Sequence, residues 1–226
     1  MGPHATRARA DSPRRRAAAR KSARLRQERG LRTEAAILDA TLQSLATRGI
    51  HDTSLDLIAA RVGVAKSSIL WHFGSKEGLL LRVAERAFST VARSLAPEIL
   101  ALPTIEERGE AMWRIYTEVV NHAPEVRRVV LYLIFCAGDQ RPEVHAGLQR
   151  LYRGTRTLLA AGLRDAVPDP RRRNQLATLA IAALDGIFLQ WLLDPKAVDL
   201  AALQKEFHRI AQRIGVVRPR RKRRGA

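Results

Sequence analysis

The segment GVAKSSILWHFGSKEGLL (residues 63–80) decides how the N-terminal third of this chain folds. Gly63 and Gly74 predict helix ends, because glycine adopts the left-handed backbone angles that close a helix. Between them we expect a short helix that is anchored in the core by Ile69 and Phe73, which are one turn apart. Its other residues are hydroxyl, basic and aromatic, a mixture that an ordinary core helix does not need.

Two further helices are expected before this one. The first begins at about Thr33, ends at Gly49 and has apolar residues at three- and four-residue spacing. The second is short. It begins either at Thr53, which has capping-box spacing with Asp56, or at Ser54, and the sequence leaves both caps open. The inward-facing residues are Ile37, Leu38, Thr41, Leu42 and Leu45 in the first helix, and Leu55, Ile58, Ala59 and Val62 in the second.

Two short helices joined at a glycine turn, with a longer helix behind them, predict a helix-turn-helix. The small Ala59 lets the short helices cross closely, and the second of them, from about Ala65, then projects far enough to enter a DNA major groove about 12 Å wide. Near its N-terminus this helix has Lys66, Ser67 and Ser68. A cation, hydroxyls and free backbone N–H groups suit phosphates and base edges, so the segment predicts a DNA-binding surface.

The stretch TSLDLIAARVGVAKSSILWHFGSKEGLL (53–80) resembles the DNA-binding domain of TetR/AcrR transcriptional regulators. The motifs IAARVGV, WHF and SKEGLL occur together and in order, and the upstream RTEAAILDATLQSLATRGI (32–50) fits the first helix of that family. Residues 31–91 cover the domain and 54–73 its helix-turn-helix. Farther on, ALDGIFLQWLLDP (183–195) resembles a late dimerisation helix of the family.

The resemblance implies a set of DNA contacts. Two residues depart from the family pattern: Leu70 stands where a phosphate-contacting tyrosine is usual, and Ala65 where a capping serine is common. Without that cap the helix loses about 1 kcal/mol. Packing of Trp71 and His72 against the next helix, and simple solvation of the two lysines, remain alternatives. The implied DNA-binding residues are Thr53, Ser54, Lys66, Ser67, Ser68, Trp71, His72 and Lys76.

The remainder of the chain also predicts helices, with prolines at their boundaries and no alternating strand pattern. The fold class is therefore all-α, with an N-terminal three-helix helix-turn-helix domain and a C-terminal helical ligand-binding and dimerisation domain. The expected divisions are a basic disordered arm (1–30), with a helix from about residue 20 left open as an alternative, the DNA-binding domain (31–91), the effector and dimerisation domain (92–214) and a basic disordered tail (215–226). The later helices are expected at about 75–95, 104–122, 124–137, 141–166, 171–193 and 198–214.

Members of the family bind a small effector in the C-terminal region, so the resemblance implies an effector here, whose identity the sequence does not give. EVRRVVLYLIFCAG (125–138) is apolar on nearly every face after Arg128, which predicts a central buried helix that includes Cys136. Aromatic residues at helical spacing are candidates for the wall of a pocket, with ordinary core packing as the alternative. The candidate ligand-binding residues are Trp113, Tyr116, Tyr132, Phe135 and Phe188.

Two late helices predict a homodimer. Each has an apolar stripe, and two such helices from each chain would form a four-helix bundle about a twofold axis, unless both stripes pack within the monomer. A dimer would place two recognition helices about one DNA turn apart, which predicts a near-palindromic double-stranded operator. The candidate dimerisation residues are Leu176, Ala180, Ala183, Ile187, Trp191, Leu203, Phe207 and Ile210.

The net charge of +18 is concentrated at the two ends: residues 1–30 have a net charge of +8 and residues 215–226 a net charge of +6. Such tails favour a polyanionic partner, either nucleic acid or an anionic membrane, although they also serve as solubilising segments. The basic residues expected to follow phosphates or enter a minor groove are Arg14, Arg15, Arg16, Arg20, Lys21 and Arg24.

Other function classes lack their motifs. The chain has no nucleotide-binding glycine loop, nucleophile elbow or HExxH zinc motif, and its histidines have no ligand spacing, so we expect no enzyme, cofactor or metal site. A single cysteine and the absence of a signal-peptide pattern favour a cytoplasmic protein without a membrane partner. We therefore expect a regulator that a small effector releases from DNA. The alternative is a nucleic-acid-compacting protein that binds through its tails alone.

Overall fold

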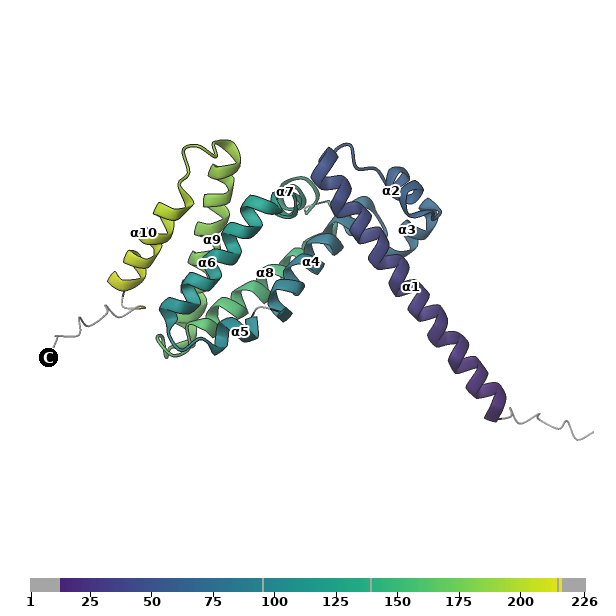
Figure 1. The fold of residues 1–226 in the computed structure, drawn as a ribbon, viewed down its shortest axis with the longest axis horizontal. Coiled ribbons are helices and arrows are strands. Elements are labelled where there is room, and N and C mark those ends of the chain that lie inside the picture. The colour runs from purple at the N-terminus through teal and green to yellow at the C-terminus, as the bar shows by residue number, and fades with distance from the viewer. Residues whose placement is uncertain (1–12, 95, 139, 215, 217–226) are drawn as a thin grey trace, which may run out of the picture.

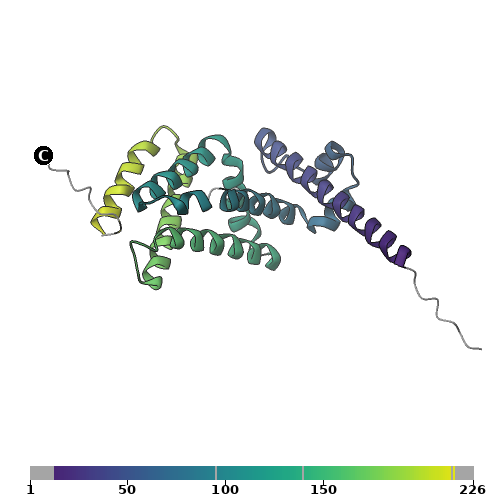
Figure 2. The same ribbon diagram turned by 60° about the horizontal axis from the view of Figure 1, so that its bottom comes forward.

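The computed structural model describes residues 13–94, 96–138, 140–214 and 216, and these residues form helices and turns without a strand, as the sequence predicts. Figure 1 shows a helical body from which the first half of α1 projects alone. Figure 2 shows that the first and last helices, α1 and α10, lie at opposite ends of the molecule. The helices of the described residues are α1 (Pro13–Arg48), α2 (Leu55–Val62), α3 (Lys66–Phe73), α4 (Lys76–Ser94), α5 (Ala96–Ala101), α6 (Ile105–His122), α7 (Pro124–Tyr132), the π-helical turn η1 (Leu133–Ala137), α8 (Pro142–Gly162), α9 (Pro170–Leu193) and α10 (Leu200–Arg213).

The N-terminal arm is helical from Pro13, so the expectation of disorder across residues 1–30 is wrong from that residue on. Alanine and arginine dominate this stretch and have among the highest helix propensities, and proline is favoured at a first helical position. Arg24 Nε lies 2.9 Å from Glu28 Oε1 one turn later, a pair that supports the helix. The expected disorder of residues 1–12 and 217–226 lies outside the described residues.

The structure resolves the ends of the two short helices. Ser54 is the N-cap of α2, because its side chain accepts a hydrogen bond from the backbone N–H of Leu57. Ala65 precedes α3 without a side-chain cap, as its methyl group requires. Gly63 and Gly74 have φ angles of 74° and 73°, which confirms their prediction as helix ends.

Helix α4 lies between the two halves of the molecule and belongs to both. Its buried residues Leu79, Leu80 and Val83 share one core with Ile37 and Ile58 of the helix-turn-helix. That core continues without a break into the C-terminal half, through Val129, Val130, Leu133, Val144 and Leu148. The helix-turn-helix is therefore not an independent hydrophobic unit.

Two features of the middle helices differ from the sequence expectation. Helix α4 ends close to the predicted boundary, but the sequence did not predict the short helix α5, which begins just before Pro97 because proline fits a first turn. The expected helix 124–137 changes into the π-helical turn η1, and the wider turn rotates the following side chains. As a result Phe135 is 77% exposed and Cys136 is also exposed, so the prediction that this segment is buried throughout is wrong at both residues.

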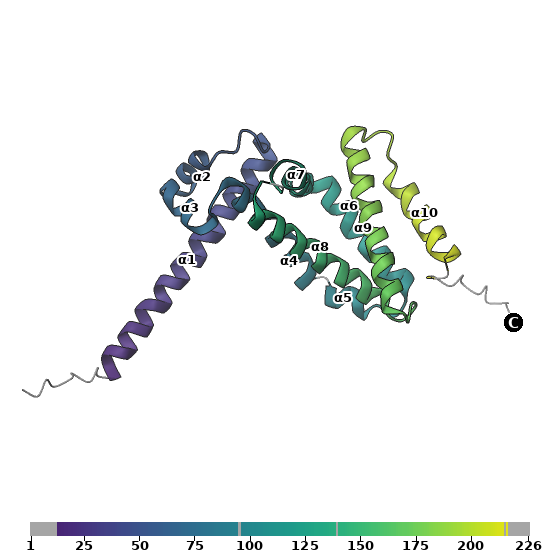
Figure 3. The same ribbon diagram turned by 180° about the vertical axis from the view of Figure 1, so that it is seen from behind.

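Helices α9 and α10, which the sequence expects to form a dimer interface together, pack against different helices of the monomer. Helix α9 packs along α8, and α10 packs along α6, in the arrangement that Figure 3 shows from behind. Leu176 packs with Val167 and Val216 in a small cluster, so the C-terminal tail begins after the expected residue 215. Ile187 and Trp191 pack around Phe188. These three α9 residues therefore pack within the monomer, the alternative that the sequence left open, and each remains partly exposed.

Within the described residues, α9 is the one helix whose length and apolar composition would allow a membrane crossing, with a mean hydropathy of 1.8. Core helices of soluble proteins pass the same test. Here α9 packs against α8, and its Asp185 is ion-paired to Arg127. Both observations fit a helix that packs on one side against a helical domain, although only 17% of its apolar window is buried.

The close packing of α8 on α4 depends on Gly147, and we predict that Gly147→Val lowers the free energy of unfolding by about 1–3 kcal/mol. A Cβ atom at Gly147 would lie 2.2 Å from Cδ2 of Leu81, which is itself only 6% exposed. Chemical denaturation followed by circular dichroism measures the change. Gly30→Ala is the control, since a Cβ atom there meets nothing within 4 Å. An equal stability of Gly147→Val and the wild type would contradict the packing described here.

Candidate DNA-binding surface and effector cavity

The outer face of α3 is formed by Lys66, Ser67, Leu70 and Trp71, which lie on one side of the helix and are all exposed. Trp71 is 81% exposed and Leu70 is 39% exposed. The opposite side of the helix buries Ile69 and Phe73 in the core, as predicted. A protruding helix that is firmly anchored on one side and presents a cation, a hydroxyl and a bare indole on the other is suited to a DNA groove and its backbone.

The other residues predicted to contact DNA divide into two groups. Ser54 is exposed at the start of α2, and Ser68 and His72 are partly exposed. The Trp71 and His72 rings meet edge to face with centroids 4.7 Å apart, which fixes their relative orientation. Thr53, in contrast, is wrong as a DNA contact because its side chain is only 3% exposed.

The buried Thr53 has a structural role instead. Its hydroxyl donates a hydrogen bond to the carbonyl oxygen of Gly49 at 2.7 Å and lies 3.0 Å from the hydroxyl of Ser44. These bonds join the end of α1 to the start of α2 and satisfy polar groups that would otherwise be buried without partners. Sequence alone did not separate Thr53 from Ser54, because both hydroxyls stand next to the helix start.

Both lysines of the surface have partners within the protein. Lys66 Nζ lies 2.8 Å from Asp56 Oδ2 and so connects α3 to α2 on the exposed side. Lys76 Nζ donates to the carbonyl oxygen of Ile50 at 2.7 Å and thereby holds the start of α4 against the end of α1. An ammonium group has three donors, so each lysine keeps donors for a phosphate.

A basic helical arm extends from this surface. Figure 1 shows the first half of α1 reaching past the other helices. Lys21, Arg24, Arg26 and Arg29 are exposed on it. The side chains of Arg14, Arg15, Arg16 and Arg20 lie outside the described residues, so their predicted phosphate contacts remain predictions.

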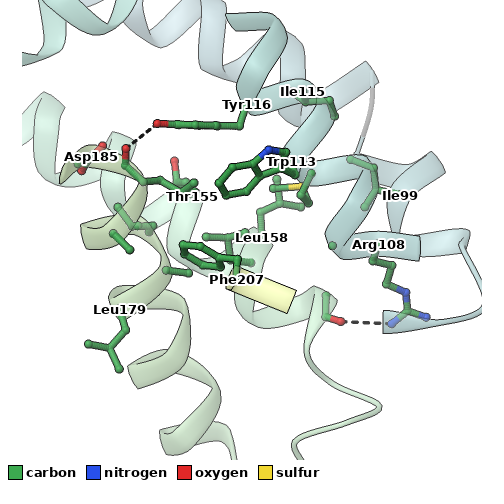
Figure 4. A pocket seen from close by; sticks show the side chains of 18 of the residues that line it. Ile99, Arg108, Trp113, Ile115, Tyr116, Thr155, Leu158, Leu179, Asp185 and Phe207 are labelled. Carbon is green, nitrogen blue, oxygen red and sulfur yellow. Dashed lines mark hydrogen bonds between the residues drawn. The ribbon is translucent and has the colours of Figure 1, made fainter. Parts of the chain in front are cut away.

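A large cavity lies between helices α4 to α10 and has a volume of about 1790 Å³. Its wall is mostly apolar, and Figure 4 shows Trp113, Tyr116 and Phe207 directed into it. Three of the five aromatic residues predicted for a pocket, Trp113, Tyr116 and Phe188, line this cavity. Phe207, together with Ala180 and Ala183, also lines the cavity, although the sequence assigned these three to a dimer interface.

Two of the predicted pocket residues are placed elsewhere. Tyr132 packs against the core around α4, and Phe135 points to the outside from η1. Both predictions are wrong for this cavity: Tyr132 ends α7 against the core, and Phe135 lies within the π-helical turn, which leaves it exposed. The spacing of apolar residues in the sequence does not predict the π-helical turn η1.

A polar cluster at one end of the cavity was missed from the sequence. Arg127 Nη2 lies 2.5 Å from Asp185 Oδ1, and the hydroxyl of Tyr152 donates to Asp185 Oδ2 at 2.9 Å. Tyr116 donates to the carbonyl oxygen of Leu184 at 2.8 Å. The available signal was Asp185 itself, since a carboxylate inside an apolar helix is seldom buried without a partner.

The two tyrosines of this cluster keep their protons at physiological pH. Burial raises the pKa of Tyr116 to about 12. Burial, followed by the nearby Asp185 carboxylate, raises the pKa of Tyr152 as well. Tyr152 therefore remains a hydrogen-bond donor to Asp185.

Ion pairs connect α4 to helices on both sides. On one side, Arg82 and Arg86 of α4 pair with Glu34 and Asp39 of α1, each at 2.7 Å. On the other side, Glu77 pairs with Arg141 at 3.2 Å and Glu85 pairs with Arg150 at 3.3 Å. These ion pairs and the shared core connect α4 to α1 on one side and to α8 on the other.

Within the part of the chain that the structure describes, no three His, Cys, Asp or Glu side chains are grouped so as to hold a metal ion. Arg127, Asp185 and Tyr152, which line the cavity, are joined by an ion pair and a hydrogen bond.

Known proteins resemble both halves of the chain. The model for bacterial regulatory proteins of the tetR family matches residues 37–83, and the model for the C-terminal domain of BetI-type transcriptional repressors matches residues 106–215. The HTH-type transcriptional regulator BetI of Rhizobium meliloti (strain 1021) is 29% identical over 169 residues, which are 74% of this chain and 81% of that protein.

Two solved structures have the same fold at low sequence identity. FadR from Bacillus subtilis, in complex with stearoyl-CoA, has a TM-score of 0.59 and 18% identity, over 78% of this chain and 96% of that one. A putative transcriptional regulator from Saccharomonospora viridis, in complex with choline, has a TM-score of 0.58 and 19% identity, over 79% of this chain and 95% of that one.

We predict that Trp71→Ala lowers the affinity for duplex DNA about tenfold or more, as expected for loss of a large exposed aromatic contact. Because Trp71 is 81% exposed, the free energy of unfolding should change by less than about 0.5 kcal/mol. Fluorescence anisotropy with a labelled duplex gives the affinity. Phe135→Ala is a matched control, since Phe135 is 77% exposed but lies on η1. Equal DNA binding by Trp71→Ala and the wild type would remove Trp71 from the interface.

Asp56→Asn should strengthen DNA binding by a few-fold, because it frees Lys66 and removes a negative charge from the surface. The pair is exposed and contributes no more than about 1 kcal/mol, so its loss is tolerated. The logarithm of the affinity should also fall more steeply with the logarithm of salt concentration, by about one unit of slope for a new phosphate contact. Glu206→Gln on α10 is the control. A weaker affinity of Asp56→Asn would show that Asp56 positions Lys66 for the bound state.

Proposed function

We propose that this chain, which belongs to the TetR family of bacterial regulatory proteins, acts as a homodimeric repressor that binds a near-palindromic operator and leaves it when a small molecule fills the cavity. The observation that supports this most directly is the outer face of α3, with Trp71 81% exposed and Lys66 and Ser67 beside it. A helix anchored by Ile69 and Phe73 keeps that face rigid, so contacts with base edges can be selective.

The homodimer is supported by an unpartnered face of α9. Leu179, Leu189 and Leu193 are 67%, 43% and 78% exposed. They lie on one side of the helix together with Ala182 and Gly186, whose small size allows another helix to approach. Helix α9 packs along α8 on another side, and a second copy of this helix pair would complete a four-helix bundle. We therefore place the twofold contact on α8 and α9.

The cavity and α4 together provide a route for release. A ligand that fits only one position of α4 shifts the equilibrium toward that position, and it does so only through its different affinity for the two states. A change from mostly bound to mostly free operator requires a difference of roughly 5 kcal/mol. The large, mostly apolar wall can provide such a difference for a ligand that buries many apolar groups.

The basic arm adds affinity that does not depend on sequence. The exposed cations along the first half of α1 can follow phosphates next to the groove that α3 occupies. A protein that used only such tails would compact nucleic acid without sequence preference. The anchored face of α3 favours the repressor.

Selection of bound duplexes from a random DNA pool tests this proposal. We expect two half-sites related by a dyad, because two copies of α3 are presented about one DNA turn apart. A version without residues 1–30 and 217–226, which lacks both basic segments, should select the same sequence with lower affinity. Selection of no consensus, or loss of all binding in the shortened protein, would support the compaction alternative instead.

The α9 interface has a separate test. The double variant Leu189→Arg/Leu193→Arg should sediment as a monomer and bind a two-half-site duplex more weakly, because the charges prevent burial of the face. Leu31→Arg on α1 is a matched control, since Leu31 is also exposed, at 58%. A dimer of unchanged stability in the double variant would place the interface elsewhere.

A further inference from the structure

Two aromatic rings and one carboxylate converge at the end of the cavity between α6, α7 and α9. The guanidinium carbon of Arg127 lies 5.2 Å from the centroid of the Tyr116 ring and 5.1 Å from that of Phe188. Arg127 Nη2 is also 2.5 Å from Asp185 Oδ1. The guanidinium therefore occupies a position between two π faces and beside a negative charge.

This arrangement is chemically a binding site for organic cations. Aromatic faces within about 6 Å attract a cation through their quadrupoles, and quaternary ammonium groups are bound by such rings in many proteins. The partly buried carboxylate of Asp185 adds charge attraction. Here the position is taken by a side chain of the same chain, and that side chain is only 15% exposed.

The cation is held firmly. Asp185 is itself fixed by the hydrogen bond from Tyr152, so both oxygens of the carboxylate have partners. Arg127 follows Pro124 in the first turn of α7, whose Val126, Val129 and Val130 are buried. A free ligand would have to displace a tethered guanidinium and leave its charge unpaired in an apolar setting, which is strongly unfavourable.

We propose that Arg127 is a built-in cation which occupies a latent quaternary ammonium site and so excludes small organic cations from the effector cavity. Arg127 is thus a specificity-determining residue. The effector uses the apolar remainder of the cavity, and removal of the Arg127 side chain uncovers the site formed by Tyr116, Phe188 and Asp185. The inference rests on the proposed function only in treating the ligand of this cavity as an effector that controls DNA binding.

Calorimetric titration of the full chain without DNA tests the proposal, with tetramethylammonium and choline as probes. We expect Arg127→Ala to bind both at least about tenfold more tightly than the wild type, the factor that one cation–π contact in a desolvated site provides. The double variant Arg127→Ala/Asp185→Asn should bind them more weakly than Arg127→Ala. The neutral carbon isostere of choline should gain no affinity in Arg127→Ala, because only a charge is attracted to the uncovered site.

If Arg127→Ala is too unstable for calorimetric titration, the shift of its unfolding temperature on addition of each probe reports binding instead. Tetramethylammonium should then raise its unfolding temperature, whereas the neutral isostere should not. Arg127→Gln, which removes the charge but retains a hydrogen-bond donor, is a milder second variant with the same expected direction. The proposal is overturned if the wild type binds the cations as tightly as the variants do, or if both folded variants fail to gain binding. Operator binding is measured in a separate experiment. A failure of the proposed repressor function would therefore not affect the cation-binding result, and a failure of the cation-binding proposal would not affect the repressor function.

Discussion

The burial of α4 against helices from both ends of the chain is the constraint on which the rest of the structure depends. Leu79, Leu80 and Val83 contribute to one core that contains side chains from α1, α2 and α3 as well as from α7 and α8. Interiors packed at this density do not deform continuously, so α4 cannot shift without moving what it touches. The same packing that stabilises the helix-turn-helix thus makes its position depend on the C-terminal half.

The candidate DNA-binding surface and the cavity lie on opposite sides of the packing around α4. On one side, the core holds α3 by Ile69 and Phe73 and leaves Trp71 in solvent, where an indole has no structural reason to be. On the other side, the helices around α4 diverge enough to leave a cavity of about 1790 Å³. Ion pairs from α4 to α1, and from α4 to Arg141 and Arg150, join the two regions at their surfaces.

The cavity has a polar end that distinguishes it from a uniformly apolar pocket. Arg127 and Asp185 are charged, mutually paired and partly buried, and two tyrosines with raised pKa values surround them as neutral donors. Such a pair is retained at an energetic disadvantage compared with apolar packing. Because the Arg127 guanidinium already occupies the space between the Tyr116 and Phe188 rings, we expect it to influence which ligands the cavity accepts.

The sequence by itself determined the all-helical fold, the anchored and exposed sides of α3, and the glycine turns, because spacing and backbone preference are local properties. It did not determine that Thr53 is buried while Ser54 is exposed, since neighbouring hydroxyls differ only in the direction that the tertiary fold gives them. Only the tertiary structure decided which side of α9 is covered and where η1 turns Phe135 outward. It also decided that Arg127 and Asp185, 58 residues apart, meet between two rings. These outcomes depend on contacts between distant segments, and a pattern of period three or four contains no information about which segment will lie on which face.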